Sequence, residues 1–186
     1  ETISWKIPGD ISLNGQVLDE AGHLVPTQID KQSRTLRFWS LAPSIGYQVF
    51  WYAAMPQQIN EAPPQQWLLE NEFLRVEICP ETGNVISIRD HAAQREVLSG
   101  PGNCLQFFQD KGQYWDAWNI DPNYTKHPLE ETELQSIHWM SWGPVQQCIR
   151  VVRQWRNSQF SQEYVLDLRS PLLKIETQVN WQETHV

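Results

Sequence analysis

One segment of the chain crowds together side chains that are suited to chemistry. Residues 110–121 hold three aromatic side chains and three carboxylates within twelve positions. An aromatic ring can stack on the apolar face of a sugar ring, and a carboxylate accepts hydrogen bonds from hydroxyl groups. We therefore take Tyr114, Trp115, Asp116 and Trp118 as candidate substrate-binding residues.

The carboxylates of this segment, Asp110, Asp116 and Asp121, raise the question of catalysis. A glycosidase needs two carboxyl groups at a fixed separation across the scissile bond, one as acid and one as nucleophile or base. Spacing along a loop does not establish that geometry, and Asp side chains commonly cap turns or form salt bridges. We expect no catalytic residue in this chain.

Three short segments bring histidine close to carboxylates: 90–91, 127–131 and 183–185. None of them has the two-histidine spacing of a zinc site. We therefore expect no metal site and no cofactor in this chain, and we expect these groups to form structural hydrogen bonds.

Composition and charge restrict the partners. The 186 residues are 40% hydrophobic and 19% charged, which is typical of a globular chain, and the formal net charge is −8. An acidic chain does not attract phosphate backbones, so we expect no nucleic acid partner. The sequence has no apolar run of roughly 18 residues, so we expect no membrane partner either.

The cysteines and the first residues bear on location. Cys79, Cys104 and Cys148 are widely spaced and odd in number, which favours reduced thiols over a disulfide framework. The first residue is Glu1, and the residues after it lack the basic and apolar regions of a signal peptide. We expect a cytoplasmic protein whose true N-terminus lies upstream.

The elements that must position the aromatic segment are strands. Alternating apolar and polar residues predict a hairpin of 74–78 with 84–90, closed by a Pro-Glu-Thr-Gly turn. They also predict an antiparallel meander over 147–156, 159–168 and 172–181, and 103–109 is a candidate for another strand. A meander this long is typical of a large sandwich.

The first part of the chain has its own strand pattern. Strands are expected at 16–18, 24–29, 35–39 and 47–52, with a turn at 19–22. A stretch rich in Pro and Gln follows. The predicted fold class is all-β: a small β domain (1–55), a linker (56–66), and part of a large antiparallel β-sandwich (67–186), truncated at its end.

Several motifs, in this order, resemble one known family. They are 19–22, 25–28, 41–47, 69–78, 82–90, 95–98, 103–105, the run Tyr114-Trp115-Asp116-Ala117-Trp118-Asn119-Ile120, and 172–175 with 180–185. Together they resemble the C-terminal β domains of glycoside hydrolase family 38 α-mannosidases, in the cytosolic and bacterial-type branch. The resemblance spans essentially the whole chain.

The resemblance implies a parent enzyme that hydrolyses terminal α-mannose from glycans with retention, through an Asp nucleophile and a zinc ion. In the family these groups lie in an N-terminal barrel and a helical domain, so the partners implied here are those missing domains and a mannose-containing glycan. The chain would then be an inactive scaffold whose Tyr114, Trp115, Asp116 and Trp118 border the active site.

Two other interpretations stay open. Abundant tryptophan on a β-sandwich also suits a free-standing carbohydrate-binding module, which needs two or three coplanar exposed aromatic rings. The exposure of Trp115 and Trp118 distinguishes that module from a mannosidase fragment. A purely structural β domain is the third interpretation.

Overall fold

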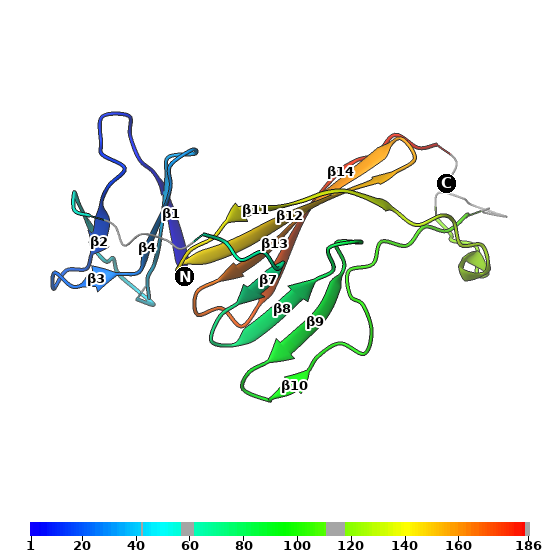
Figure 1. Cartoon of the computed structure of the whole chain (residues 1–186), viewed down its shortest axis with the longest axis horizontal. Helices are drawn as coiled ribbons and strands as arrows, with labels where there is room; N and C mark the ends of the chain where they lie inside the picture. Colours follow the sequence, from blue (N-terminus) through cyan, green and yellow to red (C-terminus); the bar gives the residue numbers. More distant parts are fainter. Residues whose placement is uncertain (42, 57–61, 111–117, 185–186) are drawn as a thin grey trace.

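The computed structural model describes residues 1–41, 43–56, 62–110 and 118–184. Within these ranges every strand pairing is antiparallel, and the only helical element is the short 3-10 turn η1 (Tyr124–Lys126). A small β unit (residues 1–53) lies at one end of the molecule and a two-layer sandwich (residues 68–180) follows it (Figure 1). The all-β fold class predicted from the sequence is confirmed.

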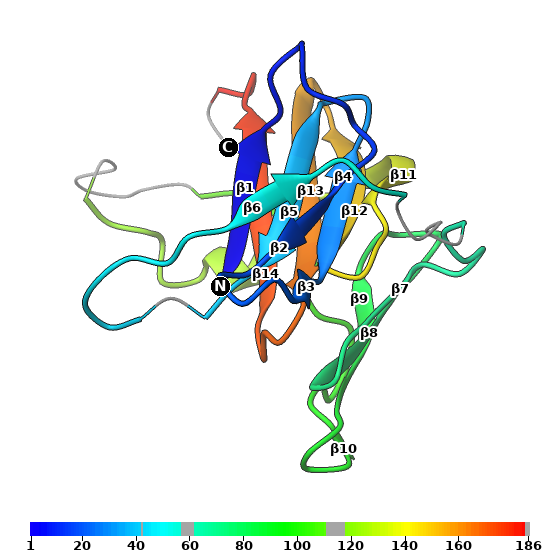
Figure 2. The same ribbon diagram turned by 90° about the vertical axis from the view of Figure 1, so that its left-hand side faces the viewer.

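The small β unit consists of two three-stranded sheets, ordered β1-β5-β4 and β3-β2-β6. Its strands are β1 (Thr2–Lys6), β2 (Gln16–Leu18), β3 (Leu24–Val25), β4 (Thr27–Asp30), β5 (Thr35–Trp39) and β6 (Trp51–Ala53). In Figure 2 this unit lies in front of the sandwich. It has a core of its own, made of Ile7, Val17, Ile29, Leu36 and Phe38.

The turn expected at 19–22 is confirmed. Asp19 Oδ1 accepts hydrogen bonds from the backbone N–H groups of Ala21 (2.9 Å) and His23 (2.8 Å). Gly22 has a φ of +81°, which costs glycine little because it lacks a Cβ atom. The turn joins β2 to β3, which pair antiparallel.

The strand expected over 24–29 is split in two at Pro26. The segment before Pro26, β3, pairs with β2, whereas the segment after it, β4, pairs with β5 in the other sheet. Proline has no N–H to donate to a strand ladder, which makes it a natural place for a strand to change sheets. Alternation alone did not reveal this change.

The sandwich consists of two four-stranded sheets, ordered β10-β9-β8-β7 and β11-β12-β13-β14 (Figure 1). The first contains β7 (Leu68–Glu70), β8 (Leu74–Ile78), β9 (Val85–Asp90) and β10 (Arg95–Glu96). The second contains β11 (Glu133–Ser141), β12 (Gln146–Trp155), β13 (Ser158–Asp167) and β14 (Leu173–Asn180). The predicted meander is therefore present as β12, β13 and β14.

The core of the sandwich takes four buried side chains from each sheet. They are Leu69, Val76, Ile78 and Val85 from the first sheet, and Ile149, Val151, Tyr164 and Leu166 from the second. Burying one such apolar side chain stabilises a fold by about 1.5–3 kcal/mol relative to leaving it exposed. The alternating pattern predicts the inward positions of β8, β12 and β13, but on β9 it favours Ile86, which is 47% exposed, whereas Val85 is buried.

The predicted hairpin is formed by β8 and β9, with a bulge between Glu77 and Ile78. Gly83 lies in its turn with a φ of +72°, and a Cβ atom there would collide with Val151 Cγ1 on the facing sheet. Glycine is thus required at this position for two reasons: the positive φ of the backbone and the close approach of the two sheets.

Residues 103–109 do not form the strand that was considered. The one β-bridge of this segment among the described residues joins Phe108 to Pro128, and the preceding Gly102 forms another isolated bridge with Val85. Strand β11, the first strand of the second sheet, was not predicted from the sequence. Two bulges, at Leu134/Ser136 and Trp139/Ser141, shift the side-chain alternation and hide this strand from a period-two search.

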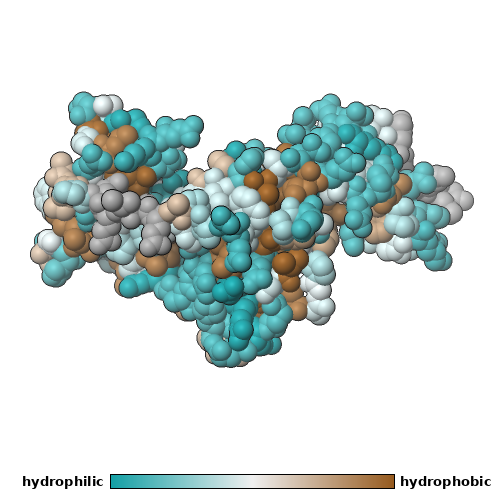
Figure 3. Space-filling view, in the orientation of Figure 1, coloured by the Kyte–Doolittle hydropathy of each residue, from teal (hydrophilic) through white to brown (hydrophobic). Residues whose placement is uncertain are grey.

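The last strand, β14, lies at an edge and is only partly covered. Ile175 pairs with buried Tyr164, and Val179 pairs with Phe160, so these side chains share the core face. They are nevertheless 40% and 50% exposed. The face shown in Figure 3 is mostly hydrophilic, with apolar patches over the small β unit and along the sandwich.

The small β unit and the sandwich are in direct contact. Gln28 of β4 hydrogen-bonds to the turn between β11 and β12, and the Arg169 guanidinium lies 4.4 Å from the centre of the Trp39 ring. The domain boundaries 1–55, 56–66 and 67–186 stay predictions, because residues 57–61 of the expected linker lie outside the described ranges.

Candidate functional site

Three of the four predicted site residues, Tyr114, Trp115 and Asp116, lie outside the described residues. The fourth, Trp118, is 86% exposed. What the structure describes is the base from which this segment leaves the sandwich.

Backbone hydrogen bonds hold the two ends of the segment together. Gln109 N–H donates to His127 O (2.9 Å), and Leu129 N–H donates to Phe107 O (2.8 Å). Asp110 Oδ1 accepts a hydrogen bond from the Asp121 N–H at 2.9 Å and so joins the first and last residues of the segment. Asp110 therefore has a structural hydrogen bond across the base.

A stack of aromatic rings fastens this base to the second sheet. The Phe107 ring stacks on Trp155 with centroids 4.2 Å apart and planes 7° from parallel, and it meets Phe160 edge-on at 5.5 Å. Trp155 stacks in turn with Trp181, at 5.7 Å. Aromatic pairs in these geometries contribute about 0.5–1.5 kcal/mol each beyond the burial of their area.

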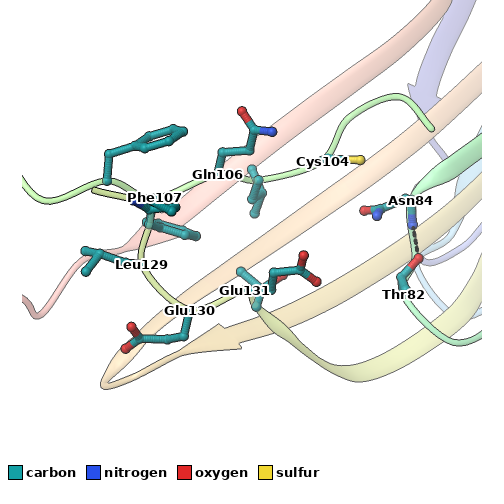
Figure 4. Close-up of a pocket in the computed structure, with 12 residues that line it drawn as sticks. Thr82, Asn84, Cys104, Gln106, Phe107, Leu129, Glu130 and Glu131 are labelled. Carbon is teal, nitrogen blue, oxygen red and sulfur yellow. Dashed lines mark hydrogen bonds between the residues drawn. The ribbon is translucent and has the colours of Figure 1, made fainter. Parts of the chain in front are cut away.

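A cavity of about 360 Å³ opens beside the stack. It is lined by Thr82 and Asn84 of the β8–β9 hairpin and by two runs, 104–108 and 128–132, which are the two arms of the base. Figure 4 shows Asn84 and Thr82 at one end of the cavity and Phe107 and Leu129 at the other. The cavity therefore combines aromatic, amide, hydroxyl and carboxylate side chains.

The two adjacent glutamates of the cavity have different environments. The Arg156 guanidinium donates to both carboxylate oxygens of Glu130, and this hydrogen bonding lowers the pKa of Glu130 below its ordinary value. Glu131 forms no hydrogen bond or ion pair with any residue in the described ranges. In Figure 4 Glu130 points away from the other labelled side chains, whereas Glu131 lies between the two ends of the cavity. Of the two glutamates, Glu131 is therefore the one whose carboxylate is available to bind a ligand in the cavity.

A buried arginine holds the side chain of Asn84 and the backbone of Thr82 in place at one end of the cavity. Arg153, 1% exposed, donates through Nε to Thr82 O (3.0 Å) and through Nη2 to Asn84 Oδ1 (3.1 Å). Its Nη1 donates to Gln162 Oε1. All of these partners are neutral, so amide and carbonyl dipoles stabilise the charge. The bond to Asn84 Oδ1 orients that amide, and within the described part of the chain its Nδ2 group has no hydrogen-bond partner.

The other histidine and carboxylate segments have structural contacts. His91 Nε2 lies 3.4 Å from Glu70 Oε1, and Glu183 Oε1 accepts from the Asn157 N–H (2.7 Å) and the Ser158 hydroxyl (3.1 Å). His185 lies outside the described residues. Among the residues that are described, no three His, Cys, Asp or Glu side chains gather in a way that would hold a metal ion. These residues therefore do not fit a zinc site.

The cavity was not predicted from the sequence. Asn84, Gln106 and Glu131 come from three separate segments and meet only through the fold. The Phe107-Phe108 pair, followed by a break in strand periodicity, was the one available signal.

The fold and the site define a class of protein: an antiparallel β-sandwich that carries a polar and aromatic cavity near its edge. Comparison with known proteins specifies the family. The model of the glycosyl hydrolases family 38 C-terminal domain matches residues 69–186. The chain belongs to this family, as the resemblance in the sequence indicated.

The relatives are longer proteins. Alpha-mannosidase 2C1 from Homo sapiens is 30% identical over 170 residues, and its Mus musculus counterpart is 29% identical over 168; each alignment covers 77% of this chain. Lysosomal alpha-mannosidase from Bos taurus is 28% identical over 182 residues, or 81% of this chain. The chain spans only 15–17% of the length of these relatives.

Within the described ranges, the structure contains no helix with the length and apolarity needed to cross a membrane.

Proposed function

We propose that this chain is a non-catalytic β part of a retaining, zinc-dependent α-mannosidase, which hydrolyses terminal α-mannose from glycans. The family match over residues 69–186 is the observation that carries the proposal. The two-sheet sandwich supports the structure of the enzyme. The rim of the active site includes Tyr114, Trp115, Asp116 and Trp118. The zinc ion and the nucleophile belong to other domains of the longer protein.

The base of the 110–121 segment supports the rim role. Its two arms are joined by backbone hydrogen bonds and fastened by the Phe107–Trp155 stack, so the segment leaves the sandwich from a rigid platform. A rigid platform suits residues that must be held in position next to a substrate. The high exposure of Trp118 provides an aromatic face that the sandwich itself does not use.

The test is kinetic and uses the full-length enzyme. Trp115→Ala and Asp116→Ala should each lower kcat/KM for an α-mannoside at least tenfold, which corresponds to about 1.4 kcal/mol of transition-state binding. The thermal midpoint should change little. Matched controls are Trp51→Ala and Asp10→Ala in the small β unit, where both side chains are exposed.

If Trp115→Ala and Asp116→Ala keep the wild-type kcat/KM, or lose it only by unfolding, the segment is structural and the rim role is wrong.

We also propose a cytoplasmic location. Three free thiols support it: Cys148 is buried, Cys79 is half-buried and Cys104 is exposed. Thiols persist in the reducing cytosol.

The alternative, a free-standing carbohydrate-binding module, draws on the exposure of Trp118. It also requires a coplanar aromatic partner, for which Trp115 is the candidate.

A further inference from the structure

The cavity beside the 110–121 base has the chemistry of a small polar ligand site. Its charged lining residues are Glu130 and Glu131, and no Lys, Arg or His side chain lines it. Arg156 pairs with Glu130, so Glu131 is the carboxylate charge left without an ion-pair partner among the described residues, and it disfavours anions. Its volume of about 360 Å³ is at the small end of the range of about 300–1,000 Å³ for ligand sites. Such a volume suits one small neutral molecule.

Unused hydrogen-bonding groups line the cavity. The Gln106 amide, the Glu131 carboxylate and the Thr132 hydroxyl have no hydrogen-bond partner within the described residues, and the Asn84 Nδ2 group also has none. The Asn84 amide is held in place from behind by Arg153. The cavity therefore presents donors and acceptors at both ends, as a molecule with several hydroxyl groups requires.

The apolar side of the cavity complements these polar groups. Phe107 and Phe108 both line it and are half-buried, Phe107 on the Trp155 ring and Phe108 edge-on against Tyr124 at 5.2 Å. A pyranose ring has hydroxyl groups at its rim and apolar C–H groups on its faces, so it needs both kinds of surface.

We propose that this cavity binds one neutral pyranose unit of a glycan. Glu131 and Gln106 bind its hydroxyl groups, Asn84 donates from the hairpin end, and the phenylalanine rings contact its C–H face. The choice of a sugar among neutral polyhydroxy compounds rests on the proposed function. The site itself includes only described residues and does not depend on Trp115 or Trp118.

The experiment titrates methyl α-D-mannopyranoside into the chain and follows nuclear magnetic resonance signals. The side-chain amides of Gln106 and Asn84 should shift in a saturable way, with a Kd of about 1–10 mM, as expected for one small neutral ligand. The indole N–H of Trp155, which donates to Glu130 O at 2.9 Å, reports on the cavity wall and should shift as well.

Glu131→Gln should raise the Kd at least fivefold, because a neutral amide accepts weaker hydrogen bonds than a carboxylate. Gln106→Ala should have a similar effect. Both residues are exposed, so the variants should keep the wild-type backbone spectrum. The matched control is Glu133→Gln: Glu133 is an exposed glutamate on β11 that does not line the cavity, and this variant should bind as the wild type does.

The proposal is wrong if the signals show no saturable shift up to about 50 mM sugar, which is well above the expected Kd. It is also wrong if glycerol at the same concentration causes equal shifts, or if Glu131→Gln binds the sugar with wild-type affinity. This binding measurement is independent of the kinetic test of Trp115 and Asp116, so either proposal can fail without the other.

Discussion

The three cysteines show how the environment of a residue controls its chemistry. Cys148, on β12, is only 4% exposed, and the Glu163 carboxylate lies on the strand next to it. Burial, followed by the charge of Glu163, raises the pKa of the Cys148 thiol to about 12. Cys104 is exposed, and Cys79 is half-buried beside Glu81. The thiolate is the reactive form of cysteine, so burial protects Cys148 twice, by limiting access and by suppressing ionisation.

Alkylation with iodoacetamide at pH 8 should therefore distinguish these thiols. Cys104 should be labelled rapidly, and Cys148 at least about 100-fold more slowly, because a thiol with a raised pKa is almost entirely protonated at this pH. Peptide mass spectrometry over a time course measures both rates. Urea unfolding should make the rates converge. Equal labelling of Cys104 and Cys148 in the folded chain would contradict the assigned environment of Cys148.

Among the elements, β4 and the turn between β11 and β12 are joined through one side chain. Gln28 is 4% exposed and uses all four of its hydrogen-bonding positions there. Its Nε2 donates to Ser141 Oγ (2.6 Å) and Gln146 O (3.0 Å), and its Oε1 accepts from the N–H groups of Val145 (3.1 Å) and Gln146 (2.9 Å). A Cβ atom at Gly143 would lie 2.5 Å from Gln28 Cδ, so glycine makes room for the amide.

Gln28→Ala should destabilise the chain by about 1–3 kcal/mol, because it leaves buried N–H groups of the turn without acceptors. For a chain of this size that corresponds to a fall in the thermal midpoint of roughly 2–12 °C. Differential scanning calorimetry measures this midpoint. Gln32→Ala, at an exposed position in the turn after β4, is the matched control and should leave the midpoint unchanged. A midpoint for Gln28→Ala within 1 °C of wild type, about the error of such scans, would show that this contact is not stabilising.

At the scale of the whole chain, the β-sandwich carries the base of the 110–121 segment at one end, and the small β unit lies at the other end (Figure 1). Glycoside hydrolysis with retention requires two carboxyl groups about 5–5.5 Å apart on opposite sides of the bond, and a bound zinc ion requires several converging ligands. The described residues provide no such metal-binding group, and Asp110 is engaged with the backbone of Asp121. Under the proposed function, the nucleophile and the zinc ligands lie in other domains of the longer protein.

The chain by itself should not hydrolyse p-nitrophenyl α-mannoside, with or without added zinc, under conditions in which the full-length enzyme does. Release of p-nitrophenol at 405 nm is a suitable assay. Turnover by this chain that is abolished by a single Asp→Asn substitution within it would refute the assignment of catalysis to other domains.

The sequence alone predicted the local features that depend on neighbouring residues. Strand periodicity identified β12, β13 and β14, and the turns at Gly22 and Gly83 followed from the need for positive φ. The order of short motifs indicated the family, because order and spacing along a chain are themselves sequence properties. The fold class and the recognition of the family were both confirmed. Pro26 and the bulges of β11 escaped prediction, because they change the sheet or the register without changing the composition.

The tertiary structure decided what depends on residues far apart in the chain. It joined Gln28 to the turn before Gln146, more than 100 positions away, and it placed Asn84, Gln106 and Glu131 around one cavity. It also left Ile175 and Val179 partly exposed although their pattern is that of a core strand. Side-chain periodicity indicates which face of the sheet a residue lies on. Whether that residue is buried depends on how far the opposite sheet covers this face, which only the packed molecule determines.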